Sequence, residues 1–146
     1  MKLRALFLCG LAVVAFEAGA TEPMDPECRD RLTRNIGVLE SAFAANRSQF
    51  DSQVDELLTK YAASHPAASK QDYKATFDAM FEERFRKEFT HLRILSGYKG
   101  VLEGRVVFSD ICKLSEKKMS KDSQQFIVQD KALYDQIVGE MSKAFR

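Results

Sequence analysis

Apolar residues recur three and four positions apart along nearly the whole chain after residue 20, and this spacing constrains the fold more than any other feature. Residues spaced in this way lie on one face of an α-helix, so each segment can bury one side and leave the other in water. Signals that begin and end helices fall between the periodic segments. The pattern therefore predicts an all-α fold.

Five helices are predicted from the spacing. The first begins at Asp25, which can cap free backbone amides, and Pro26 suits its first position. Asn46 and Arg47 interrupt the pattern, and Ser48 resembles the start of a capping box for a second helix. The expected helices cover about 25–43, 48–64, 69–95, 98–114 and 123–145, with a polar link at 115–121. Residues 98–114 also fit a strand or an irregular turn, because they contain several valines and two glycines.

The first twenty residues have the features of a secretory signal peptide. Lys2 and Arg4 precede an apolar run at 5–16, and a small-x-small site follows at 18–20. The run is shorter than the roughly twenty residues that a membrane-spanning helix needs, and no later stretch approaches that length. We expect residues 1–20 to be removed and residues 21–146 to form one soluble domain, a single antiparallel bundle of about five helices. Its expected location is the periplasm or the extracellular space.

The charges are balanced. The chain has 22 Lys and Arg against 21 Asp and Glu, and removal of Lys2, Arg4 and Glu17 leaves equal numbers. Proteins that bind nucleic acid need an excess of basic residues to replace counterions around phosphates. Neutrality therefore argues against a nucleic-acid partner and against a polybasic membrane-surface protein.

The cysteines reduce to one pair. Cys9 leaves with the signal peptide, and Leu8 before it is a poor match to a lipoprotein signal. Cys28 and Cys112 remain, and in an oxidising compartment such a pair is expected to form a disulfide. A bridge over 84 positions would stabilise the fold by roughly 4 to 5 kcal/mol on the chain-entropy model. The alternative, a metal or redox pair, lacks the CxxC spacing.

Two surface or core features are candidate binding sites. Aromatic residues spaced four apart at Tyr73, Phe77, Phe81, Phe85 and Phe89 form a row along the third predicted helix. The row suits a helix core, and the alternative is an apolar pocket or a groove for a partner. The second candidate is a group of basic residues around the fourth loop that could steer an acidic partner: Lys113, Lys117, Lys118 and Lys121.

Metal and cofactor sites are not expected. Glu88 and His91 have the Glu-x-x-His spacing of di-iron helical proteins, but that site needs the motif twice. The second histidine, His65, precedes Pro66 and has no Glu three residues upstream. Replacement of His91 is therefore expected to leave metal content unchanged. No CxxCH motif for covalent haem is present, and the methionines at helical spacing suit core packing better than axial ligation.

No catalytic constellation stands out, so an enzyme is not expected. A small, bridged, exported helical protein without cofactor motifs is best suited to binding another exported or envelope protein, such as an immunity or inhibitor protein, a chaperone or an adaptor. The alternative is a carrier that holds haem, a metal or an apolar small ligand between its helices.

Overall fold

The fold is built from helices. The computed structural model describes residues 23–85, 88–89, 91–105 and 110–145 of the chain. These residues form four α-helices and one short 3₁₀ helix, without a strand: α1 (Pro26–Ser64), α2 (Lys70–Phe85), α3 (His91–Leu102), η1 (Ile111–Lys113) and α4 (Glu116–Ala144). The all-α prediction is confirmed, but the described residues contain four α-helices where about five were expected. The expected signal peptide at 1–20 lies outside the described residues.

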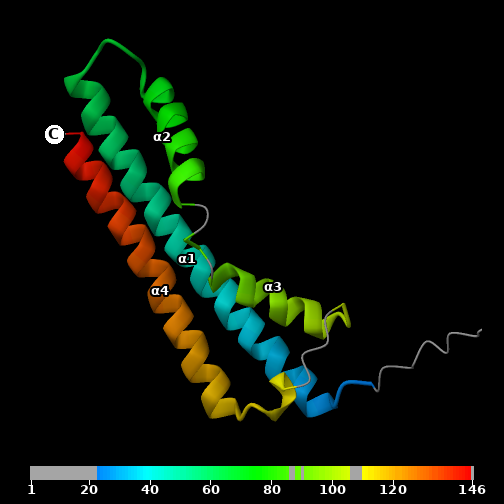
Figure 1. Cartoon of the computed structure of the whole chain (residues 1–146). Helices are drawn as coiled ribbons and strands as arrows, with labels where there is room; N and C mark the ends of the chain where they lie inside the picture. Colours follow the sequence, from blue (N-terminus) through cyan, green and yellow to red (C-terminus); the bar gives the residue numbers. More distant parts are fainter. Residues whose placement is uncertain (1–22, 86–87, 90, 106–109, 146) are drawn as a thin grey trace, which may run out of the picture.

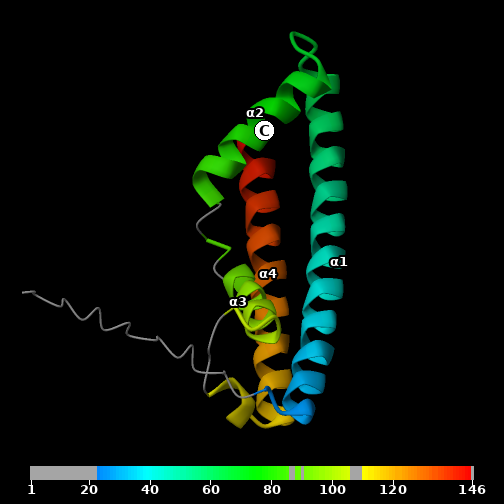
Figure 2. The ribbon, with the colours of Figure 1, turned by 90° about the vertical axis from the view of Figure 1, so that its right-hand side faces the viewer.

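The two long helices, α1 and α4, lie side by side along the length of the molecule (Figures 1 and 2). They run in the same direction, because Asn35 meets Ser123 near one end and Phe50 meets Tyr134 further along both helices. The expectation of antiparallel helices is therefore wrong for this pair. α2 and α3 together make one return pass along α1, so α1 and α4 are the first and third of three alternating passes and run parallel.

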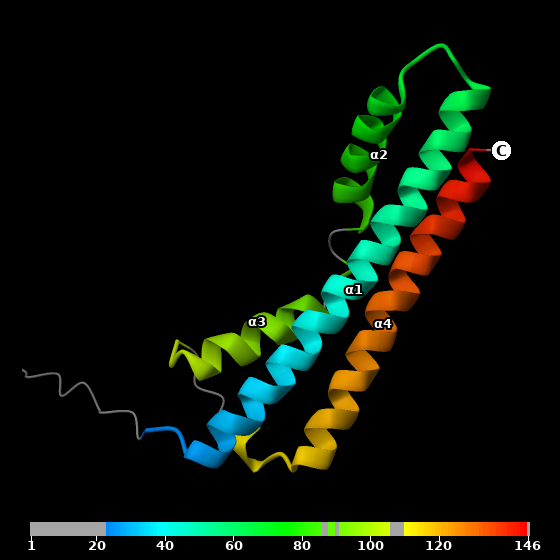
Figure 3. The same ribbon diagram turned by 180° about the vertical axis from the view of Figure 1, so that it is seen from behind.

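The return pass covers one side of the α1–α4 pair. α2 packs on the C-terminal half of α1 in the opposite direction, since Tyr73 meets Tyr61 and Phe81 meets Phe50. α3 then continues towards the N-terminal end of α1 (Figure 3).

α1 is continuous where a break was predicted. Its 39 residues include Asn46 and Arg47, which the sequence pattern placed between two helices. Asn46 donates from Nδ2 to Asp130 Oδ2 on α4 at 2.9 Å, and Arg47 pairs with Asp51 one turn on at 2.9 Å. Because its amide finds a partner on α4, Asn46 continues the helix against its modest helix propensity, while Arg47 is itself a good helix former. Ser48 therefore lies inside α1 and is not a cap.

The third predicted helix is divided instead. Its predicted start is confirmed, because the Ser69 hydroxyl and the Asp72 carboxylate hydrogen-bond each other's backbone amides. However, α2 ends at Phe85 and α3 begins at His91, so no helix runs from 69 to 95.

α3 also ends differently from the prediction. It passes through Ser96 and Gly97, the expected stop, and ends at Leu102. Gly104 has a positive φ of 71°, and the Arg105 amide donates back to the Gly100 carbonyl at 2.8 Å. This left-handed glycine is the true helix stop, because a side chain at that φ would be strained. The predicted helix at 98–114 is therefore wrong, although residues 106–109 lie outside the description.

α4 begins seven residues before the predicted start. The Ser115 hydroxyl accepts from the Lys118 amide at 3.2 Å and caps the helix, and Glu116 follows in the first turn. The segment 115–121, expected to be a polar link, is thus mostly helical.

The core has two clusters. The larger one lies between α1, α2 and α4 and includes Phe50, Leu58, Phe77, Tyr134 and Ile137. The smaller one lies at the N-terminal end of α1 and includes Cys28, Leu32, Val101, Ile111 and Met119.

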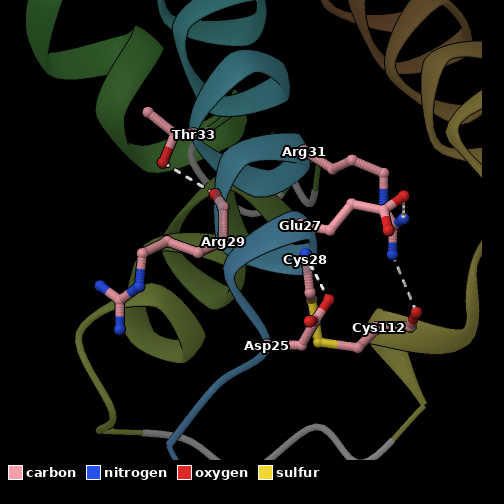
Figure 4. The surroundings of a disulfide bond; sticks show 7 residues. All are labelled: Asp25, Glu27, Cys28, Arg29, Arg31, Thr33 and Cys112. Carbon is pink, nitrogen blue, oxygen red and sulfur yellow. Dashed lines mark hydrogen bonds and ion pairs between the residues drawn. A yellow bond between two sulfur atoms is a disulfide. The ribbon is translucent and has the colours of Figure 1, made fainter.

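The predicted disulfide is confirmed. Cys28 and Cys112 are bonded, with their Cα atoms 5.3 Å apart, and Cys28 is fully buried. Figure 4 shows Arg31 reaching from α1 to the other side of the bridge, where it donates to the Cys112 carbonyl at 3.0 Å. The bridge and this hydrogen bond hold η1 against the start of α1. Across the described ranges, none of the helices combines the length and apolarity of a membrane span.

Candidate functional site

The predicted aromatic row lies mostly inside the protein. Phe77 and Phe89 are 4% and 9% exposed, and Phe81 is half-buried against the same cluster. The Phe77 and Phe89 rings pack against Phe50 and Tyr134, with centroids 6.3 and 5.0 Å apart. These residues fill the core. The Phe85 side chain lies outside the described part, and a binding role for the row stays a prediction.

The predicted basic residues are exposed, and two of them are paired. Lys113 bonds Asp110 at 2.6 Å, and this hydrogen bond raises the pKa of the Lys113 ammonium. Lys118 pairs with Asp122 at 2.5 Å. Lys117 and Lys121 lie exposed in the first turns of α4. The carboxylates of Asp110 and Asp122 neutralise part of this positive charge, and steering of an acidic partner stays a prediction.

An apolar groove lies between α3, η1 and α4. It has a volume of about 480 Å³, within the usual range for ligand sites. The two charged residues at it, Arg93 and Asp110, are exposed. The other residues that line it are uncharged, most of them large and apolar: Ile94, Gly97, Tyr98, Ile111, Leu114 and Phe126.

Helix geometry and the disulfide together form this groove. Ile94, Gly97 and Tyr98 lie three and four positions apart, so they share one face of α3. Ile111 and Leu114 flank Cys112, so the bridge to α1 fixes the opposite wall. Gly97 has no side chain to fill the space between the walls.

Tyr98 stays neutral under ordinary conditions. Burial raises the pKa of its hydroxyl, and the nearby carboxylate of Asp122 raises it further, whereas Lys118 lowers it. A neutral hydroxyl suits an apolar groove, since a phenolate there would be poorly solvated.

A buried polar network joins three helices further along. His91, at the start of α3, is 5% exposed, and its Nε2 lies 2.7 Å from Oδ1 of the fully buried Asp130. Asn46 of α1 donates to the other carboxylate oxygen. The rings of Phe43 and Phe89 pack on the imidazole, with centroids 5.3 and 5.6 Å away.

His91 also lines a second hollow, of about 370 Å³, between the start of α3 and α4. Its Nδ1 has no hydrogen-bond partner among the described residues. Within them, the only buried unpartnered side-chain nitrogen or oxygen is Nε of Arg31, so Nδ1 of His91 is accessible to solvent. The other lining residues are Glu88, Gln129, Ala132, Leu133 and Gln136.

Sequence reasoning missed both hollows. The groove depends on Gly97 lying inside a helix, where the sequence pattern placed a helix end. The network depends on Asp130, one of many acidic residues whose position gave no signal. Its one available hint was that Asp130 falls on the apolar face of its helix, four residues before Tyr134. In the described part, no group of three or more His, Cys, Asp and Glu side chains is placed to hold a metal.

Comparisons with known proteins give no match: no family model fits the chain, and no curated protein or solved structure is significantly similar to it.

Proposed function

We propose that the mature chain is an exported binding protein whose groove between α3, η1 and α4 receives apolar side chains of a partner protein. The observation that carries this proposal is the groove itself. Its apolar walls come from three elements, and a disulfide fixes one of them. Such preorganised hollows are where buried anchor residues of a partner contribute most to affinity.

Gly97 is the second support. Glycine inside a helix costs about 1 kcal/mol relative to alanine, so the position is unfavourable for folding alone. At this position the missing side chain leaves the space that a ligand group would fill. Gly97 therefore lowers the stability of α3 and leaves open space in the groove.

A carrier of a small apolar ligand is the second candidate. The groove volume of about 480 Å³ suits such a ligand as well as it suits protein side chains. The two functions differ in what stays bound to the native protein during purification, which is a partner protein in the first case and a small apolar molecule in the second.

Gly97→Leu tests the proposal. A leucine at this position is expected to fill the groove without weakening the helix. The matched control is Gly37→Leu, because Gly37 lies exposed on α1 with no neighbouring atom near an added Cβ. Each protein, expressed in its own host, would be purified from the exported fraction and weighed by native mass spectrometry.

The proposal predicts a stoichiometric partner protein on the wild type and on Gly37→Leu, and none on Gly97→Leu. A small molecule lost in the same pattern would favour the carrier. A partner retained equally by all three proteins would show that the groove is not the binding site.

A further inference from the structure

We infer that the partner segment that enters the groove between α3, η1 and α4 carries an acidic side chain, which pairs with Arg93 and lies about one helical turn from the apolar anchor. This inference rests on the proposed function, because it states the chemistry of the partner that the groove receives. Two observations carry it: the charge balance around the groove, and the position of Arg93 beside Gly97.

Arg93 is the one charged residue lining the groove that has no counter-ion among the described residues. Its side chain is exposed and forms no ion pair or hydrogen bond there. The other charged residue at the groove, Asp110, pairs with Lys113 at 2.6 Å. Most of the described arginines contact a carboxylate, which makes Arg93 an exception: Arg31, Arg34, Arg47 and Arg105 are all paired.

The charges beside the groove also balance each other. Lys118 and Asp122 lie on α4 near the hydroxyl of Tyr98, on which they act in opposite directions, and they pair with each other at 2.5 Å. The groove is therefore apolar inside and carries one uncompensated positive charge, that of Arg93, at its edge. Interfaces arrange opposite charges against each other, so the fitting partner has an acidic group at this edge.

The spacing on α3 places this acidic group relative to the apolar anchor. Arg93 and Gly97 are four positions apart, so they lie on the same helix face about one turn from each other. The anchor fills the space beside Gly97, and the guanidinium of Arg93 then lies within reach of a side chain up to about four positions away in the partner. Arginine pairs well with the planar carboxylates of Asp and Glu, because its fork of N–H donors matches their two oxygens.

Random peptides displayed on phage test the inference, with the oxidised mature protein as the target. Peptides that bind wild type but not Gly97→Leu are groove ligands. We expect these peptides to combine a large apolar residue with Asp or Glu within about four positions of it.

Arg93→Glu reverses the charge at the edge without filling the groove. A synthetic groove peptide should bind this variant at least about threefold more weakly than wild type, in the range of an exposed ion pair. Replacing the acidic residue of the peptide by Lys should restore its affinity for Arg93→Glu, and a folding defect could not produce this rescue. Fluorescence anisotropy of the labelled peptide measures each affinity.

The matched control is Arg29→Glu. The side chain of Arg29 also has no partner among the described residues and lies in the first turn of a helix, but it does not line the groove. Glutamate is favourable near a helix start, so both variants should fold.

Groove peptides without an acidic preference, an unchanged affinity in Arg93→Glu, or an equal loss in Arg29→Glu would each overturn this inference and leave the proposed function standing. Absence of any peptide that Gly97→Leu excludes would overturn both. Dodecanoate that binds wild type but not Gly97→Leu, with no groove peptide found, would assign the acidic group to a small ligand and overturn the protein segment.

Discussion

Nδ2 of Asn46 donates a hydrogen bond to Oδ2 of Asp130 at 2.9 Å, and so joins the middle of α1 to the middle of α4. The other oxygen of Asp130 bonds His91 of α3, so one buried carboxylate connects three helices. Buried polar groups are costly unless they are fully paired. This network therefore fixes how α1, α3 and α4 align along one another.

Asp130→Ala should strongly destabilise the protein. Removing one member of a buried pair leaves the other without its partner, at a cost of about 3 to 5 kcal/mol. Chemical denaturation followed by circular dichroism measures the change. The control is Asp135→Ala, which removes an exposed ion pair between Asp135 and Lys131 on the same helix. It should change the free energy of unfolding by less than about 1 kcal/mol. Equal effects of the two substitutions would show that the network contributes little.

Loss of the disulfide should lower stability by roughly 4 to 5 kcal/mol, because the bridge closes a loop of 84 positions. Cys28→Ser combined with Cys112→Ser, compared with wild type in denaturant, measures it. The exported wild type should also be two hydrogens lighter than the fully reduced chain that begins at Thr21. Equal masses before and after reduction would contradict the bridge.

Each ring of the aromatic row should contribute to the free energy of unfolding in proportion to how deeply that ring is buried. Phe77→Ala should cost about 3 to 5 kcal/mol, since the ring is 4% exposed. Met80→Ala, at a more exposed position of the same helix, should cost much less. Retained stability in Phe77→Ala together with lost partner binding would place that ring in a binding surface.

Alkaline pH should weaken the fold through Tyr98 and Tyr134. Burial raises the pKa of both hydroxyls, and the carboxylates of Asp122 and Asp130 raise them further. Because the folded pKa lies above the unfolded value, the neutral form favours folding. This contribution is complete below the unfolded pKa of about 10 and is lost as pH rises through the folded values.

Absorbance titration of the folded protein measures this effect. Two of the four tyrosines should ionise above pH 10, and Tyr98→Phe should remove one of them. Asp122→Asn should lower the pKa of Tyr98. An unchanged titration curve in Tyr98→Phe would contradict the shift.

The sequence predicted those parts of the fold that depend on local signals. Asp25 caps α1, the reciprocal bonds of Ser69 and Asp72 start α2, and the cysteines form their bridge. Apolar spacing also indicated buried members of the aromatic row, Phe77 and Phe89, because burial of one helix side needs no knowledge of the partner.

The errors arose where tertiary contacts override propensity. Asn46 continues α1 because Asp130 pairs with it from a helix 84 positions away. Gly97 lies within α3, although the sequence pattern placed a helix end there, and Gly104 follows the true end of α3, although it falls inside a predicted helix. Neither the groove nor the His91 network could be predicted, since each needs the relative placement of helices that local patterns do not encode.

Photocrosslinking from the groove is the most direct test of the proposed function. A benzophenone amino acid would replace Ile94, which lines the groove, or Gln71, which is exposed on α2. In the native host, the account predicts one crosslinked partner protein from position 94 that Gly97→Leu abolishes, and none from position 71. Absence of a crosslink at 94, or the same crosslinked protein from both positions, would contradict it.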